Sequence, residues 1–117
     1  MELAPLGINV TVLEPGYFRT DFLDSSSLSP SDNIIEDYAA TAGVMRQVAQ
    51  DFNKKQAGDP VKLAKAIVKL GHAVNPPLHL PMGKDALEMF KAKMARFNAE
   101  IEEWKDVIIT TDLADVT

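Results

Sequence analysis

Apolar residues follow two different periods along this chain, and each period is typical of a different element. Residues 8–13 (INVTVL) are β-branched or apolar at nearly every position, as in a strand covered on both faces of a parallel sheet. Residues 78–83 (LHLPMG) alternate as a second short strand after the turn at 76–77. Residues 22–33 are rich in Ser, Asp and Pro without a period, which indicates a surface loop.

Apolar residues spaced by three and four predict two helices between the strands. The first can open at Ser31 or Asp32. Its apolar face consists of Ile35, Tyr38, Ala42, Met45, Val48 and Phe52. The second has Asp59 as N-cap and Pro60 at its first position, where a missing N–H costs nothing, and it ends at Gly71.

The longest predicted helix covers residues 84–105, and Asp85 with Glu88 forms a capping-box-like start. Its apolar seam consists of Leu87, Phe90, Met94, Phe97, Ile101 and Trp104. This seam is shorter than three heptads, which favours packing on a sheet over a coiled coil. Before the first strand, residues 2–7 are predicted to be the last turn of a helix that Gly7 ends in the left-handed conformation.

The predicted order is helix end, strand, loop, helix, helix, strand, helix. Strands joined by helical crossovers pair in parallel. A sheet of only two strands is marginal in water, and such strands bury their faces only among further strands and helices. The sequence therefore predicts a part of a larger α/β domain.

Composition and charge narrow the classes of function. The formal net charge is -5 and the pI is near 4.9, so nucleic acid is not expected as a partner. The chain has no cysteine, no apolar run of membrane-spanning length and no signal-peptide pattern at its start. These features favour a cytoplasmic protein with no membrane partner and no cysteine-based metal site.

The end of the first strand is the most informative place in the sequence. Glu14, Pro15 and Gly16 form a turn, and two aromatic residues, Tyr17 and Phe18, follow directly. A loop that only turns is usually small and polar, whereas this loop places bulky apolar surface where the chain leaves the sheet. We expect something to fill the space beside it.

These residues carry a resemblance to a known family. The run ELAPLGINVTVLEPGYFRTDF resembles the late part of short-chain dehydrogenases/reductases, which read E-L-A-P-x-G-I-x-V-x-x-[VIL]-x-P-G-x-x-x-T. GDPVKLAKAIVKL and PPLHLPMGKDALEMF resemble the final helix, strand and helix of the same family. The resemblance covers nearly the whole chain and is weakest over residues 22–57.

The resemblance implies a nicotinamide cofactor, NAD or NADP, bound at the carboxyl edge of a doubly wound sheet. It implies that Pro15 and Gly16 let the backbone approach the nicotinamide, since glycine has no Cβ to exclude the ring. It also implies that the main chain of Phe18 hydrogen-bonds the carboxamide, and that Thr20 contacts the carboxamide or the pyrophosphate.

The resemblance further implies that residues 1–117 are the C-terminal part of a single Rossmann-type NAD(P)-binding domain. Residues 22–57 would be a lid-like substrate region and 84–105 the final long helix. Tyr17 and Phe22 would contact a small carbonyl or alcohol substrate. Homo-oligomers are expected for the complete enzyme.

Two hallmarks of the family are absent from the sequence. The six glycines never fall into a Gly-rich phosphate-loop spacing, and neither tyrosine has a lysine four residues on, since Asp21 follows Tyr17 and Ala42 follows Tyr38. We therefore expect the chain alone to be inactive and interpret it as the C-terminal part of an NAD(P)-dependent oxidoreductase. The alternative is a non-catalytic α/β module for interaction or dimerisation.

Other polar residues are weaker candidates. His72 and His79 lack partners at ligand spacing, so structural roles are favoured for both. Glu14 at the strand end more often caps backbone groups than acts in a site. Arg19 and Asp21 either touch cofactor phosphate or form a surface pair.

Overall fold

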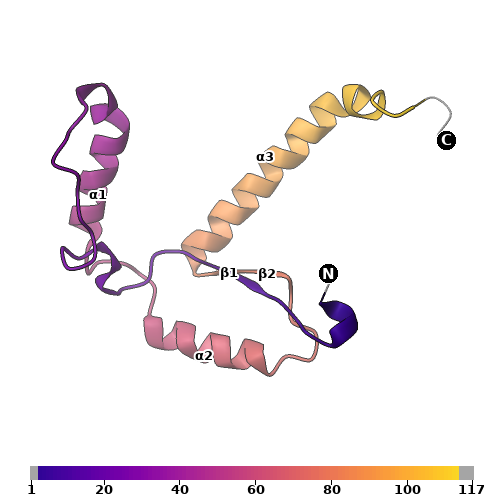
Figure 1. The fold of residues 1–117 in the computed structure, drawn as a ribbon, viewed down its shortest axis with the longest axis horizontal. Coiled ribbons are helices and arrows are strands. Elements are labelled where there is room, and N and C mark those ends of the chain that lie inside the picture. The colour runs from indigo at the N-terminus through magenta and orange to yellow at the C-terminus, as the bar shows by residue number, and fades with distance from the viewer. Residues whose placement is uncertain (1–2, 114–117) are drawn as a thin grey trace.

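The computed structural model describes residues 3–113, in which helices extend in different directions from a pair of short strands (Figure 1). The elements are the short helices η1 (Ala4–Leu6), η2 (Asp21–Leu23), η3 (Glu36–Tyr38) and η4 (Ala39–Gly43), the helices α1 (Val44–Phe52), α2 (Pro60–Gly71) and α3 (Lys84–Ile109), and the strands β1 (Val12–Pro15) and β2 (His79–Met82). The two strands pair in parallel, and the connection between them contains α1 and α2. The predicted α/β class with helical crossovers is confirmed.

The register of the strand pair sets which backbone groups face the two free edges of the sheet. Val12 lies opposite His79, and the N–H groups of Val12 and Gly16 donate to the carbonyls of Leu78 and Met82 at 2.8 Å each. Backbone groups alternate in direction along a strand, so Pro81 faces away from β1. Because proline has no N–H, the free edge of β2 lacks a donor at Pro81. The free edge of β1 likewise lacks one at Pro15, the last residue of that strand.

The first strand differs from its prediction. Residues 8–13 were expected to form it, but β1 begins at Val12 and continues to Pro15. Its partner strand begins only at His79, so residues 8–11 have no neighbouring strand in the described part of the chain. Val10 is 53% exposed, so the described residues do not bury this segment on both of its faces, in contrast to the prediction from the sequence.

The first helix also begins later than predicted. Ser31 does not cap it, because the Ser31 hydroxyl accepts the N–H of Asn33 at 3.2 Å within a local turn. The helical conformation starts at η3, passes through η4, which is a π-helical turn, and becomes the α-helix α1. The predicted apolar face therefore lies on three consecutive helical pieces.

The second helix follows its prediction closely. The Asp59 carboxylate accepts the N–H groups of Val61 at 2.8 Å and Lys62 at 3.3 Å, and α2 ends at Gly71. At the N-terminal end, Gly7 has the predicted left-handed conformation with φ of 71°. It follows the three-residue turn η1 rather than an α-helix, and Glu2 lies outside the described residues.

The third helix is longer than predicted and begins differently. It runs from Lys84 to Ile109, beyond the expected 105. Gly83 is its N-cap with φ of 102°, and no side chain caps it. The predicted capping box is wrong, because Glu88 pairs with Lys84 at 3.8 Å and Asp85 bonds to another part of the chain.

The described chain buries almost no apolar core of its own. Ala86 is the single buried hydrophobic residue among those described. The accessible surface is 10150 Å², against about 6,300 Å² for a compact monomer of this mass. The radius of gyration is 20.4 Å, against about 13 Å for a compact domain of this length. The helices and strands of the described chain therefore do not cover one another's apolar faces.

Candidate functional site

A cavity of about 550 Å³ lies beside the loop that follows β1, and we name it the loop cavity. Residues 15–20 are named the Pro-Gly loop. The cavity is lined by Pro15, Gly16, Tyr17, Phe18, Thr20, Phe22, Leu23, Gln56, Leu63, Asp85 and Met89. All six residues predicted to contact cofactor or substrate are in this lining, so the structure brings them together.

Asp85, in the first turn of α3, anchors the Pro-Gly loop. Its Oδ2 accepts the backbone N–H of Tyr17 at 2.7 Å. This N–H holds the pKa of Asp85 below its usual value of 3.8, against the opposing effect of desolvation, and the N–H of Ala86 lowers it further. The Asp85 side chain is therefore a carboxylate at neutral pH.

The position of the same carboxylate explains why residue 16 has no side chain. A Cβ built on Gly16 would coincide with the carboxylate of Asp85. The sequence suggested that this position is a glycine to admit a nicotinamide ring. In the structure, the space that a Cβ at this position needs is occupied by a residue of the protein itself.

A second glycine brings the start of α2 against the Pro-Gly loop. Phe18 forms an isolated parallel bridge with Gly58, in which the N–H of Arg19 donates to the Gly58 carbonyl at 2.8 Å. The N–H of Gly58 donates to the Tyr17 carbonyl at 3.1 Å. A Cβ on Gly58 would approach the Phe18 ring within 2.6 Å, so this close contact requires glycine.

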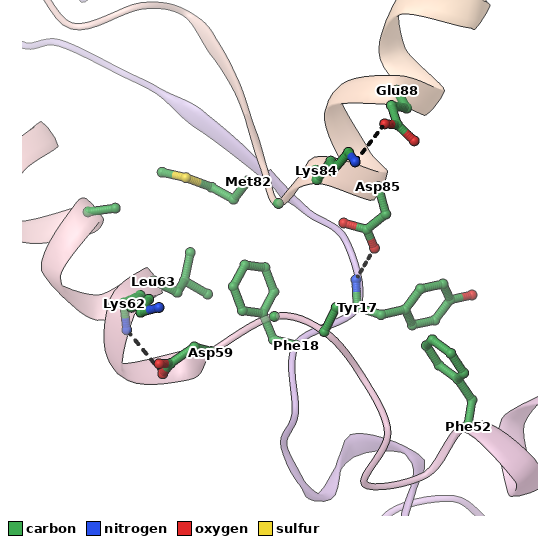
Figure 2. Close-up of a pocket in the computed structure, with 14 residues that line it drawn as sticks. Tyr17, Phe18, Phe52, Asp59, Lys62, Leu63, Met82, Lys84, Asp85 and Glu88 are labelled. Atoms are coloured by element: carbon green, nitrogen blue, oxygen red, sulfur yellow. Dashed lines mark hydrogen bonds and ion pairs between the residues drawn. The ribbon is translucent and has the colours of Figure 1, made fainter.

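The two aromatic residues of the loop point to different neighbours, as Figure 2 shows in a second cavity of about 570 Å³. The Phe18 ring lies between Leu63 of α2 and the start of α3. The Tyr17 ring meets Phe52 of α1 edge to face, with 5.6 Å between ring centroids. The aromatic pair therefore connects the loop to both crossover helices.

Thr20 has a structural role in the observed conformation. Its hydroxyl oxygen accepts the N–H of Phe22 at 3.3 Å and caps η2, and its own N–H donates to the Phe18 carbonyl at 2.9 Å. The hydroxyl proton stays available to another acceptor. Phe22 is 77% exposed, so its ring is accessible.

The segment after η2 folds back on α1. Asp24 accepts the N–H of Ser26 at 3.1 Å and the amide of Asn53 at 3.2 Å, and both bonds lower the Asp24 pKa. Asp21 pairs with Lys54, which raises the Lys54 pKa. A cavity of about 710 Å³ lies between this segment and α1.

The surface pair of Arg19 with Asp21, one of the two alternatives for these residues, is not formed. Asp21 binds Lys54, and the Nε of Arg19 donates to the backbone carbonyl of Gln56 at 3.0 Å. Gln56 itself is 1% exposed, and its side-chain amide has no hydrogen-bond partner among the described residues.

Glu14 of β1 and His79 of β2 lie on adjacent strands, two positions apart in the register. The Nδ1 of His79 is 3.5 Å from Oε1 of Glu14, and Oε2 of Glu14 is buried without a partner in the described chain. Residues 3–113 contain no group of three metal-binding side chains and no helix long and apolar enough to span a membrane. The favoured structural role of His79 agrees with its pairing to Glu14.

Sequence reasoning missed three residues that shape the loop. Asp85 and Gly58 were interpreted only as parts of helix starts, and Gln56 was not considered. Each acts on the Pro-Gly loop across a long stretch of chain. Local pattern carries no signal for such contacts. Only the glycine immediately before the Asp59 cap could have drawn attention to a close backbone approach.

Comparison with known proteins supports the α/β fold and a relation to oxidoreductases. No family model matches the chain. It is 33% identical over 110 residues to an oxidoreductase, BOA17, of Botryotinia fuckeliana, covering 94% of this chain and 39% of that protein. A short-chain dehydrogenase crystal structure from Streptomyces avermitilis superposes with a TM-score of 0.79 at 36% identity, covering 96% of this chain and 40% of that one.

The parallel strand pair, its helical crossover and the loop at its carboxyl end define an α/β chain of the doubly wound type. By sequence and by fold, the chain is a relative of the short-chain dehydrogenases/reductases. It spans about two fifths of the length of the two proteins that it matches.

Proposed function

We propose that this chain is the C-terminal part of an NAD(P)-dependent oxidoreductase of the short-chain type, and that residues 1–117 are the C-terminal part of its single Rossmann-type domain. The complete enzyme would transfer a hydride from an alcohol to NAD(P)⁺, giving a carbonyl compound, NAD(P)H and a proton, or the reverse. One observation carries the proposal. Four residues implied for the cofactor, Pro15, Gly16, Phe18 and Thr20, line one cavity at the carboxyl end of β1.

The loop geometry supports a role in holding a cofactor. The Phe18 carbonyl already accepts the N–H of Thr20, whereas no hydrogen bond from the Phe18 N–H occurs in the described chain. This N–H is therefore a candidate donor to a carboxamide oxygen. The Thr20 hydroxyl can donate while it caps η2. Both groups lie at the edge of the sheet where doubly wound folds bind dinucleotides.

The substrate would lie on the side of the cavity formed by Tyr17 and Phe22. Phe22 begins the segment 22–57, which we propose as the substrate region. The hydrogen bond from the Asn53 amide to Asp24 joins the beginning of this segment to the residue that follows α1, near the end of the segment. We also propose α3 as the last helix of the complete domain. A cytoplasmic setting stays a prediction of composition.

The catalytic parts must come from outside these residues, because the sequence holds neither the Gly-rich loop nor the Tyr-x-x-x-Lys pair. Determining the coding sequence upstream of Met1 tests the proposal. An in-frame G-x-x-x-G-x-G and Tyr-x-x-x-Lys, with NAD(P)H oxidation by the encoded protein on a carbonyl panel, is expected. A start signal with neither motif upstream contradicts it and leaves the non-catalytic module, which the comparisons do not favour.

A further inference from the structure

We propose that Asp85 makes the loop cavity selective for a positively charged aromatic ring, so that an oxidised nicotinamide binds there more tightly than a reduced one. The inference rests on the proposed function for the nature of the ligand. It adds which redox state of the ring the site prefers, and it assigns that preference to one carboxylate.

The charge at the cavity is the first observation. Asp85 is the single acidic residue in the lining, which contains no lysine and no arginine. Its neighbour Lys84 pairs with Glu88, and no ion pair in the described chain includes Asp85. The negative charge at this point is therefore not compensated by a cation from residues 3–113.

The carboxylate is also held in place. Its Oδ2 receives the Tyr17 N–H, and the carboxylate lies against the Gly16 backbone, in the space that a Cβ there would need. A fixed charge needs no rearrangement when a ligand binds, which strengthens its effect on a nearby charge. The N–H of Ala86, in the first turn of α3, also acts on this carboxylate.

Aromatic side chains form the second observation. Tyr17, Phe18 and Phe22 line the same cavity as Asp85. The faces of such rings attract cations, with the attraction strongest where the cation is desolvated. A flat cation of pyridinium type therefore matches both the aromatic lining and the charge, whereas an anionic group meets only repulsion.

Nicotinamide provides a matched pair of ligands for this argument. Addition of a hydride to the pyridinium ring removes its positive charge and changes its size very little. Shape and carboxamide bonding are nearly the same in the two states, so the ratio of their affinities isolates the electrostatic contribution. A half-buried carboxylate several ångströms from the ring should change this ratio about three- to tenfold.

The experiment measures binding of 1-methylnicotinamide and of 1-methyl-1,4-dihydronicotinamide to the 117-residue chain by ligand-observed NMR. The cation is expected to bind more tightly to the unchanged chain, and its advantage should shrink as salt is raised. In Asp85→Asn the advantage should fall about three- to tenfold. The amide keeps an oxygen for the Tyr17 N–H, so the loop position is preserved.

Asp106→Asn is the matched control, because it removes the same charge from an exposed site on α3 and should leave the ratio unchanged. A ratio that Asp85→Asn leaves unchanged overturns the inference, and so does tighter binding of the neutral ring or binding of neither ring. The proposed function is judged separately, by NAD(P)H turnover of the longer protein. Loss of affinity for both rings equally would mean a merely structural role for Asp85.

Discussion

The backbone N–H of Tyr17 donates to the carboxylate of Asp85 at 2.7 Å, across a separation of 68 residues in sequence. This bond joins the end of β1 to the first turn of α3. It places a charged group directly behind Gly16, in the space that a side chain there would need. The geometry of the Pro-Gly loop is thus set by a residue near the other end of the chain.

Replacement of Gly16 by valine should disrupt this arrangement. The new side chain meets the Asp85 carboxylate, and overpacking of this kind costs about 1–3 kcal/mol. Urea unfolding of the complete enzyme measures the cost, and its cofactor affinity should also fall sharply. Gly71→Ala is the control, because nothing lies within 4 Å of a Cβ at Gly71. Equal effects at both positions would contradict the role given to Asp85.

Replacement of Thr20 by alanine should have a smaller effect. The variant loses the hydroxyl that caps η2 and the proposed bond to the cofactor, and a lost hydrogen bond costs about 0.5–1.5 kcal/mol. In the complete enzyme, calorimetry should show cofactor affinity reduced about two- to tenfold. Thr20→Ser should restore it, and Ser26→Ala should change nothing. A cofactor dissociation constant unaffected by Thr20→Ala removes Thr20 from the site.

Protonation of Asp85 in acid should weaken its hydrogen bond with the Tyr17 N–H and so free the Pro-Gly loop. Its pKa in the folded chain lies below 3.8, so the carboxylate stabilises the fold above that pH, and this contribution is lost as the pH falls through the folded value. The NMR shift of the Tyr17 N–H should titrate with a midpoint below 3.8. Asp85→Asn should remove this transition. A midpoint at or above the usual value would show that the bond does not form in solution.

The isolated chain should associate with itself. Phe97 and Trp104 of α3 are 54% and 59% exposed, and many other large apolar side chains are uncovered. Contiguous apolar surface beyond a few hundred Å² usually causes association. Light scattering should show dimers or larger species, and Phe97→Lys with Trp104→Lys should reduce them while keeping the helical circular dichroism. A monomer that unfolds cooperatively would refute this expectation.

The isolated chain should not bind whole NAD or NADP tightly. The Gly-rich loop that would hold the pyrophosphate is absent from its sequence, and the ring alone supplies a small part of the contact surface. Calorimetric titration with both cofactors should give no micromolar binding, and a panel of alcohols and carbonyls should show no turnover. Micromolar binding of either cofactor, or measurable turnover, would contradict this prediction.

The sequence by itself determined the elements whose signals are local. The Asp59 cap, the proline at position 60 and the period of three and four specified α2 almost to the residue, because a cap and its N–H partners lie within one turn. The left-handed Gly7 and the short strand at 79–82 were also predictable. The family resemblance added the placement of the Pro-Gly loop at the end of β1.

Only the tertiary structure decided how that loop is held. Asp85 has the sequence context of an N-cap, yet its carboxylate bonds to Tyr17, because the parallel pairing brings the ends of β1 and β2 to the same edge of the sheet. The start of β1 at Val12 likewise depends on where β2 begins. Both outcomes depend on contacts between residues far apart in the chain, and local periodicity contains no information about which distant group will arrive.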